Sequence, residues 1–300
     1  MAGMMAGWWR LPLHAAVLFT SAVLFTSCDA EHTVVIGSKN FTEQIILGEL
    51  LAQQIEARTD LRVKRQFNLG GTFVCHQALV SGKIDAYVEY TGTALTAILR
   101  APPSTDPQEA YRTVQDAYRR RFNVEWLPPL GFTNTFAIMI RTEEATRLGL
   151  RTLSQLAEQA PRWRAAFGYE FLERADGFTG LAKTYGLRFA EPPRVMDLAL
   201  TYQALADRKV EVIAGDSTNG LIIALGLTVL EDDRHYFPAY QAAPVVSSKD
   251  ASKLSTLQTA LSALAGIVTD DDMRRLNYEI DGKRRDIAKV VKEFRQEKRL

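Results

Sequence analysis

Lys39 stands where a predicted strand gives way to a predicted helix. The strand is the β-branched run 33–38, and the helix extends through Arg58 with a wide apolar face. Asn40 or Thr42 is expected to cap this helix. A lysine beside the N-terminal end of a helix favours an anion, because both are positively charged. The alternative is a solvated lysine in a loop.

A second candidate site follows the strand that ends at Tyr90. Apolar and polar residues alternate up to this tyrosine, and Gly92 marks the turn after it. The corner presents an aromatic ring and the hydroxyls of Thr91 and Thr93. Ligands of open α/β sheets bind outside the carboxyl ends of strands, so this corner could hold a small molecule. A half-buried strand with a tyrosine in the core is the alternative.

Three further strand-like segments also end in polar or aromatic residues. Their ends lie at residues 134–136, at Arg174 and at Asp216. Together with the two sites above, these ends converge only if the chain forms two sheets that face one another across a cleft. The β-α-β-α order of residues 33–99 indicates a mostly parallel sheet covered by helices.

The composition of the chain is that of an ordinary globular protein. Its 300 residues suit two domains, with 47% hydrophobic residues, 24% charged residues and a net charge of +1. No basic cluster with interleaved aromatic residues is present, so a nucleic-acid partner is not expected. The four histidines are scattered and none has metal-ligand spacing. We therefore expect neither a metal nor a cofactor.

Residues 1–27 are predicted to be a signal peptide. A short basic start that ends at Arg10 precedes an uncharged apolar run up to residue 27. That run is marginal for a persistent membrane span. Residues 25–28 resemble a bacterial lipoprotein box, although Phe25 stands where leucine is usual, and Cys28 is the predicted lipidation site. The expected location is the periplasmic or extracellular face of the cytoplasmic membrane, with plain export as the alternative.

Motifs along residues 32–300 resemble, in order, those of the substrate-binding proteins of osmoprotectant ABC importers, which bind glycine betaine, choline, carnitine and proline betaine. The motifs are GSKNFTEQ (37–44), NLGGT (68–72) and YVEYTGT (87–93), continued by residues 130–132, 176–178 and 237–246. The resemblance implies an α/β, two-lobed periplasmic-binding-protein fold of type II. In this fold two mixed sheets, flanked by helices, have a ligand cleft between the lobes.

The resemblance further implies a division into lobes and a set of partners. Residues 32–133 and 244–300 would form lobe one, and residues 134–243 would form lobe two. The lobes would close over the ligand by a hinge motion. The ligand would then pass to an ABC permease driven by an ATPase, and no reaction would be catalysed.

Ligand-contacting roles follow from the same resemblance. A quaternary ammonium group has no N–H to donate, so ring faces recognise it, and Tyr90 and Tyr240 match tyrosines of the family's box. Asn134 and Phe136 stand where the family often has aspartate and tyrosine. The family's carboxylate clasp is matched by Lys39, Thr93 and Arg174. The predicted ligand-binding residues are Lys39, Tyr90, Thr93, Asn134, Phe136, Arg174, Asp216 and Tyr240.

Asp216 departs from the family, which often has a tyrosine at this position. Its carboxylate can attract a cation as strongly as one ring does, and it can accept N–H hydrogen bonds. A rival ligand class is therefore a cation that carries N–H groups, unless Asp216 faces solvent. Two competing functions are a ligand sensor without transport and a hydrolase or transferase that uses Ser217, His235 and Asp216. These three residues match no recognised nucleophile spacing.

Overall fold

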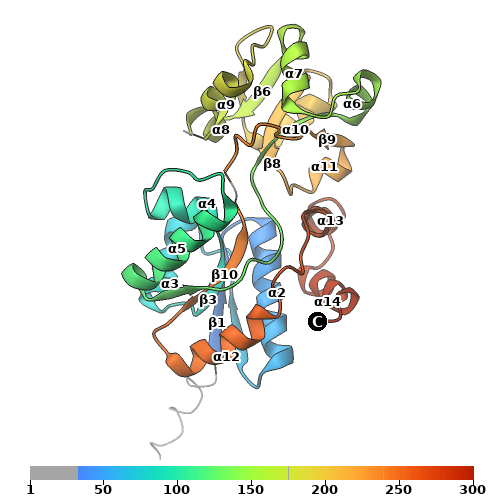
Figure 1. The fold of residues 1–300 in the computed structure, drawn as a ribbon. Coiled ribbons are helices and arrows are strands. Elements are labelled where there is room, and N and C mark those ends of the chain that lie inside the picture. The colour runs from blue at the N-terminus through green and yellow to red at the C-terminus, as the bar shows by residue number, and fades with distance from the viewer. Residues whose placement is uncertain (1–32, 175, 239) are drawn as a thin grey trace, which may run out of the picture. The chain divides into compact units, whose positions relative to one another are not determined.

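Two five-stranded sheets organise residues 33–174, 176–238 and 240–300, which are the residues described by a computed structural model (Figure 1). The predicted signal peptide, Cys28 and the first residue of predicted lobe one lie outside these residues. Each sheet contains parallel and antiparallel pairs and is flanked by helices, which confirms the predicted α/β class with two mixed sheets.

The first sheet has the strand order β2-β1-β3-β10-β4. Its strands are β1 (Thr33–Gly37), β2 (Arg62–Gln66), β3 (Ala86–Tyr90), β4 (Val124–Trp126) and β10 (Ala242–Ser247). The β-α-β-α segment gives the parallel pairs of β1 with β2 and β3, as predicted. β10 returns from far along the chain and pairs antiparallel with β3 and β4. Because Ala242 lies opposite Tyr90, the residues just before β10 lie beside the end of β3.

The second sheet has the strand order β7-β6-β8-β5-β9. Its strands are β5 (Phe136–Arg141), β6 (Ala165–Gly168), β7 (Arg194–Met196), β8 (Val212–Asp216) and β9 (Leu227–Val229). β5 and β8 run antiparallel, and their register places Phe136 opposite Asp216. The short strand β7 was not predicted, because it is a three-residue, largely exposed strand that follows two prolines.

Fifteen helical segments connect and cover these strands within the described residues. They are α2 (Thr42–Arg58), α3 (Thr72–Ser81), α4 (Thr91–Thr93), the π-helical turn η1 (Ala94–Ile98), α5 (Pro107–Phe122), α6 (Thr142–Leu148), α7 (Leu153–Gln159), the 3₁₀ turn η2 (Ala160–Arg162), α8 (Tyr169–Glu173), α9 (Phe178–Tyr185), α10 (Leu198–Ala206), α11 (Leu221–Ala224), α12 (Ala251–Ser262), α13 (Asp270–Asp281) and α14 (Ile287–Glu297).

Two local predictions of helices are wrong. The apolar pattern of the sequence predicts one helix over residues 148–160, but this helix does not form. α6 ends before Gly149, which lies in the left-handed region (φ 66°), and Thr152 starts α7 with a capping box. α2 begins after Phe41 and has no side-chain cap. Thr42 instead donates its hydroxyl hydrogen bond to Asp281 Oδ1 over 2.7 Å, so its oxygen is directed toward α13.

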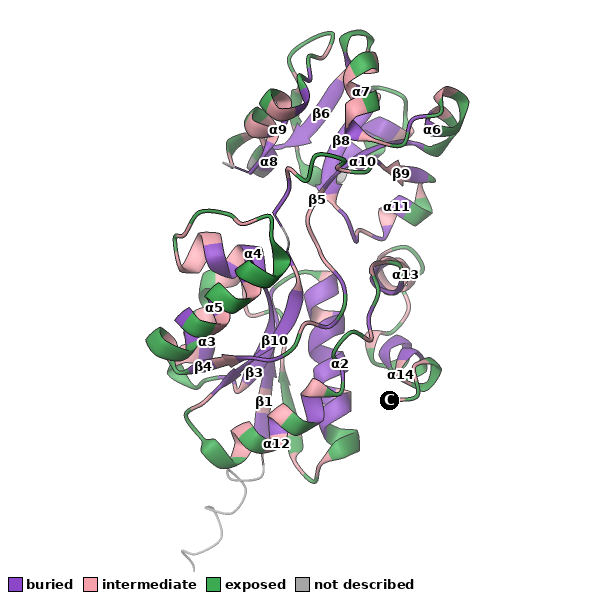
Figure 2. Cartoon of the chain, viewed as in Figure 1, coloured by how far each residue is buried: buried purple, intermediate pink, exposed green. Residues whose placement is uncertain are grey.

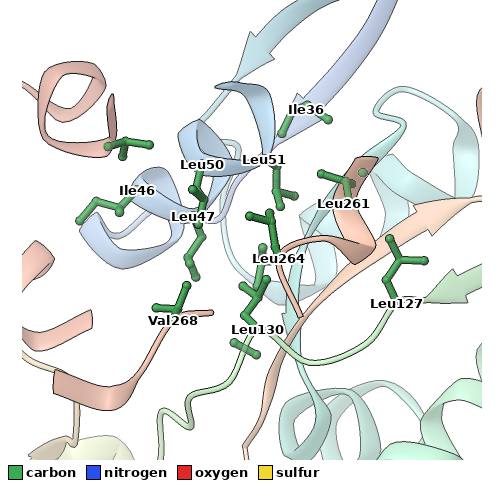
Figure 3. Close-up of a cluster of buried hydrophobic side chains, with 14 of the residues drawn as sticks. Ile36, Ile46, Leu47, Leu50, Leu51, Leu127, Leu130, Leu261, Leu264 and Val268 are labelled. Atoms are coloured by element: carbon green, nitrogen blue, oxygen red, sulfur yellow. The ribbon is translucent and has the colours of Figure 1, made fainter. Parts of the chain in front are cut away.

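The core beside the first sheet is built around α2. Figure 2 shows this helix as largely buried, in contrast to the exposed faces of the outer helices. In Figure 3 the leucines of α2 point toward side chains from the C-terminal region and from the segment after β4. The labelled members are Ile36, Ile46, Leu47, Leu50, Leu51, Leu127, Leu130, Leu261, Leu264 and Val268. This packing fixes α2, and therefore fixes the position of Glu43 in its first turn.

Asp106 is the N-cap residue of α5, and its contribution to stability can be tested. Its carboxylate accepts hydrogen bonds from the backbone N–H groups of Gln108 and Glu109 at the start of α5. We expect Asp106→Ala to lower the free energy of unfolding by about 0.5–2 kcal/mol, because two N–H groups lose their acceptor. Asp116→Ala on the same helix is the matched control, with a change below about 0.5 kcal/mol. Urea unfolding measures both, and equal effects would contradict the capping role.

Candidate ligand-binding site

Glu43 lies at the centre of a cluster of hydrogen bonds. Its Oε1 accepts from Tyr90 Oη at 2.5 Å and from Asn134 Nδ2 at 3.0 Å. Its Oε2 accepts from Thr218 Oγ1 at 2.5 Å and from Asn277 Nδ2 at 3.0 Å. These donors come from β3, from the segment before β5, from the segment after β8 and from α13. Glu43 therefore ties together elements that lie beside both sheets.

The environment of Glu43 favours the protonated acid. Burial raises the pKa of this carboxyl, and the four hydrogen bonds that it accepts offset the effect only in part. No lysine or arginine is among its hydrogen-bond partners in the described structure. A small polar cavity of about 130 Å³ adjoins it, and Asn134, Asp216 and Thr218 are among the residues that line that cavity.

Lys39 is buried and forms an ion pair with Glu89. Glu89 is on β3, where it also accepts hydrogen bonds from Tyr87 Oη at 3.0 Å and from the backbone N of Tyr90 at 2.8 Å. The ammonium Nζ of Lys39 lies 5.1 Å from the centre of the Tyr90 ring. The predicted lysine and tyrosine are thus in contact, but the lysine already has an internal counter-ion.

Arg174, like Lys39, forms an ion pair with a carboxylate of the protein. Its Nε and Nη2 donate to the two carboxylate oxygens of Asp176, at 2.8 and 2.7 Å. Nη2 also donates to Tyr240 Oη at 2.7 Å, and that hydroxyl donates to Asp176. Burial alone would raise the pKa of Asp176, but the hydrogen bonds from Arg174 and Tyr240 hold the pKa below its usual value.

Rings lie next to the Arg174 guanidinium. Its carbon Cζ is 5.1 Å from the centre of the Phe136 ring and 6.0 Å from the centre of the Tyr240 ring. Phe136 also packs edge-on against Phe171, which belongs to the hydrophobic core beside the second sheet. The Phe136 ring is therefore only partly available to a ligand. Asp216 is the cross-strand neighbour of Phe136 and is half-buried, which excludes a fully solvent-facing side chain.

Gly92 allows Tyr240 to lie against the backbone of α4. A Cβ atom on Gly92 would be 2.7 Å from ring atoms of Tyr240, closer than real side chains come. The prediction that Gly92 marks a turn is correct in place, but the turn is helical and continues into η1. Thr93 lies on the same helical turn and is half-buried.

Contacts in the described structure link seven of the eight predicted residues. Lys39 touches Tyr90, which shares Glu43 with Asn134. The backbone N of Asn134 donates to the carbonyl of Tyr240 at 3.1 Å. Tyr240 contacts Arg174, which lies over Phe136, the neighbour of Asp216. Thr93 joins this group only through its position next to Gly92.

Sequence reasoning missed the acidic partners in this site. Glu43 and Glu89 lie within two of the motifs that carry the resemblance, and Asp176 opens another. One signal was available in the sequence, because Glu89 is the one charged residue of the strand 86–90, and a charge in a strand that becomes buried calls for a partner. Thr218 and Asn277 carried no comparable signal.

The proposed hydrolase residues do not form a nucleophilic set. The Ser217 hydroxyl accepts from the backbone N of Thr135 at 3.2 Å and lies 3.4 Å from the carbonyl oxygen of Thr133. Ser217 and His235 border one hollow of about 340 Å³, whose lining does not include Asp216. Across residues 33–174, 176–238 and 240–300, no group of three His, Cys, Asp or Glu side chains could hold a metal ion.

Two mixed sheets joined by crossing segments, with a polar and aromatic site where they meet, define a two-lobed substrate-binding protein. The family described as "Substrate binding domain of ABC-type glycine betaine transport system" matches residues 32–297. The chain belongs to this family, as the sequence motifs predict.

Named relatives span nearly the same length as this chain. The carnitine transport binding protein OpuCC of Listeria monocytogenes is 32% identical over 297 residues, which cover 95% of this chain and 96% of the relative. The glycine-betaine-binding protein of Pseudomonas aeruginosa is 33% identical over 279 residues, or 89% of this chain and 88% of the relative. A crystal structure described as a glycine betaine/carnitine/choline ABC transporter superposes with a TM-score of 0.83 at 33% identity, covering 88% and 98% of the two chains.

Family membership settles the general role of the chain. It is a substrate-binding protein of an ABC importer, which binds a small molecule outside the cytoplasm and delivers it to a permease. The family consists of solute-binding proteins rather than enzymes, which confirms that prediction. Among the described helices, none combines the length and apolarity that a membrane crossing requires.

Proposed function

We propose that this protein captures a quaternary-ammonium compound of the glycine betaine or choline type, in an aromatic cleft walled by Tyr90, Phe136 and Tyr240. Asp216 adds a negative charge on the side where the family often has another ring. Lys39, Thr93 and Arg174 are the candidates for contacting the rest of the ligand, and Asn134 orders the junction through Glu43.

One observation carries this proposal: each of the three rings already faces a cationic group of the protein. The distances from ring centre to cation are 5.1 Å for Tyr90, 5.1 Å for Phe136 and 6.0 Å for Tyr240. Ring faces in such positions attract cations, and each contact contributes about 0.5–2 kcal/mol. A trimethylammonium group is bound by this interaction and needs no hydrogen-bond acceptor.

The proposal includes the lobe division and the anchor. Strands of the first sheet support a lobe made of residues 32–133 and the C-terminal part of the chain, and strands of the second sheet support a lobe that begins at residue 134. The proposed return to lobe one, between residues 243 and 244, falls within β10 (Ala242–Ser247), which belongs to the first sheet. Cleavage before Cys28 and lipid attachment there would hold the protein at the membrane, and mass spectrometry of the exported protein tests this.

Tyr240 is the residue with which to test the ring contacts. We expect Tyr240→Leu to weaken the binding of choline or glycine betaine about 2- to 30-fold, because one ring face is lost. Tyr240→Phe keeps the face and is expected to change Kd less than about threefold, on the same scale. Isothermal titration calorimetry measures both.

Tyr111→Leu is the matched control, because this partly buried tyrosine of α5 bonds the backbone of Trp126 outside the site. Its substitution should leave the affinity unchanged. If the wild-type protein binds neither choline, carnitine nor any betaine, the proposed ligand class is wrong.

A further inference from the structure

A hollow of about 460 Å³, here called the α2–α12 hollow, lies between the C-terminal end of α2 and one face of α12. Figure 1 shows α12 beside this end of α2. One guanidinium and four hydroxyls line the hollow, together with two alanines of α12. The polar lining residues are Arg58, Thr59, Ser255, Thr256 and Thr259. The volume is within the range of about 300–1,000 Å³ that small-molecule sites occupy.

The α2–α12 hollow is separate from the candidate ligand-binding site. Glu43 is in the first turn of α2 and Arg58 is the last residue of that helix, so the two lie about 22 Å apart along the helix axis. None of the eight predicted ligand-binding residues lines the hollow. A molecule bound there therefore leaves the Glu43 cluster and its neighbours unobstructed.

Arg58 has no counter-ion within the described part of the chain. It is exposed, and no carboxylate among the described residues forms an ion pair with it. Glu56 of the same helix is bound to Arg65 instead, at 2.7 Å. Asp60 is nearby in the sequence but does not line the hollow. The N–H groups of the Arg58 guanidinium are therefore available to an anion.

A second guanidinium, that of Arg295, lies near the first. Its Nη2 donates to Gln54 Oε1 at 3.1 Å, and its buried Nε has no hydrogen-bond partner among the described residues. Gln54 in turn donates to the carbonyl of Ala260, which lines the hollow. Burial lowers the pKa of Arg295, and the positive charge of Arg58 lowers it further. An anion close to both groups relieves the repulsion between them.

The hydroxyls of α12 add donors to one wall of the hollow. Ser255 is exposed, and its hydroxyl has no hydrogen-bond partner within the described residues. Thr256 and Thr259 donate to helix carbonyls one turn earlier, at 3.2 and 3.0 Å, and rotation of either side chain redirects its hydroxyl toward a ligand. The C-terminal carbonyls of α2 carry only about half a negative charge, so the guanidinium groups decide the sign of the field. Donors from two helices fit a tetrahedral oxyanion.

From this lining we propose that the α2–α12 hollow binds a phosphate group, with Arg58 as its main ligand and Ser255 as a second donor. A guanidinium binds phosphate through two parallel N–H···O bonds, which leaves other phosphate oxygens for the hydroxyls. The phosphate is that of an anionic phospholipid head group or free inorganic phosphate. This site goes beyond the proposed capture of a quaternary-ammonium compound and does not depend on it.

The position of the hollow favours the lipid as the source. Thr59 lies three residues before Arg62, which is opposite Thr33, the first residue of β1. Cys28, the proposed lipid attachment site, comes five residues before Thr33, which is at most about 18 Å of extended chain. An anchor at Cys28 would therefore keep this end of the first sheet close to the head groups of the membrane.

Two binding assays on the unlipidated mature chain, residues 28–300, test the proposal and identify the source of the phosphate. Isothermal titration calorimetry in a chloride buffer measures the binding of inorganic phosphate. Co-sedimentation measures binding to vesicles of phosphatidylethanolamine that contain phosphatidylglycerol. We expect Arg58→Gln to weaken at least one of these interactions by at least about tenfold, because charge-assisted hydrogen bonds are lost.

A control and a second variant accompany Arg58→Gln. Arg112→Gln removes the same charge from an exposed arginine of α5 that does not line the hollow, and it should change neither interaction. Ser255→Asp places a carboxylate in the hollow, where it competes for Arg58, so it should also weaken binding by at least about tenfold. All three positions are exposed, so we expect every variant to fold, which circular dichroism checks.

The two assays separate the possible outcomes. Binding of inorganic phosphate that depends on Arg58 supports the site with free phosphate as a ligand, and Arg58-dependent binding to vesicles alone supports it with the lipid head group. Absence of both interactions would overturn the proposal, as would equal effects of Arg58→Gln and Arg112→Gln. The affinity for choline or glycine betaine is a separate measurement of the proposed function, and it should be the same in wild type and Arg58→Gln.

Discussion

Replacing Glu43 by alanine is expected to lower the free energy of unfolding by about 2–6 kcal/mol. Two hydroxyls and two amides donate to this buried carboxyl. The hydroxyls of Tyr90 and Thr218 can rotate toward other acceptors, but the amides of Asn134 and Asn277 would lose theirs. Each buried donor left unsatisfied costs about 1–3 kcal/mol. Urea unfolding followed by circular dichroism measures the change.

Glu56→Ala provides the control on the same helix. Glu56 is exposed and pairs with Arg65, so its loss should cost less than about 1 kcal/mol. A Glu43→Ala effect no larger than that of Glu56→Ala would show that the cluster contributes little.

The raised pKa of Glu43 predicts that the folding stability contributed by this carboxyl decreases as the pH rises. Its folded-state pKa is raised above the ordinary value of 4.5, so the folded chain holds this proton more tightly than the unfolded chain. The resulting stability is present in full below about pH 4.5 and is lost as the pH rises through the folded pKa. Glu43→Gln cannot lose a proton, so its stability relative to wild type should increase with pH in that window. A difference that stays constant from pH 4 to about pH 8 would contradict the raised pKa.

Adding one methyl group at Gly220 is expected to weaken ligand binding about 5- to 150-fold. A Cβ atom there would lie 2.6 Å from the backbone N of Tyr278 and 2.8 Å from the carbonyl carbon of Asn277, both in α13. The backbone of a helix cannot yield locally, so α13 and the segment after β8 must move apart, at about 1–3 kcal/mol. Both contribute to the Glu43 cluster, which adjoins the site. Calorimetry on Gly220→Ala with the tightest-binding ligand measures the loss.

Gly71→Ala is the matched control for this change. Gly71 has φ −77° and a Cβ atom there would meet no atom within 4 Å, so alanine fits without strain. It should bind as the wild type does, and both variants should retain cooperative unfolding. Unchanged binding by Gly220→Ala would mean that the two elements can separate without affecting the site.

The strands and the positions of candidate residues were predictable because both depend on short-range patterns. Strand patterns that end in polar or aromatic residues located Tyr90 and Asp216 at strand ends and Lys39 just after one, where the structure has them. The expectation that a strand ends at Arg174 is wrong, because Arg174 follows the helix α8 (Tyr169–Glu173). The resemblance added Tyr240, whose contact with Arg174 spans 66 residues. Such patterns specify which residue stands at an edge of a sheet.

The partners of these residues were not predictable, because pairing depends on tertiary structure. Glu43 reads from the sequence as a favourable charge in the first turn of a helix, where it would ordinarily face solvent. Its donors lie 47, 91, 175 and 234 residues away. The pairing of Lys39 with Glu89 similarly joins residues 50 positions apart. A sequence shows that the cations are present, but only the fold shows that they already have counter-ions.

The position of β10 in the first sheet has a consequence for the order of folding. This strand comes from residues 242–247 and lies between β3 and β4, which end at Tyr90 and Trp126. All strands of the second sheet fall between Phe136 and Val229, so that sheet can form while the first still lacks a central strand. Until β10 arrives, β3 and β4 have open edges that invite pairing with other chains. A chain that stops before Ala242 would therefore be prone to aggregate through its N-terminal half.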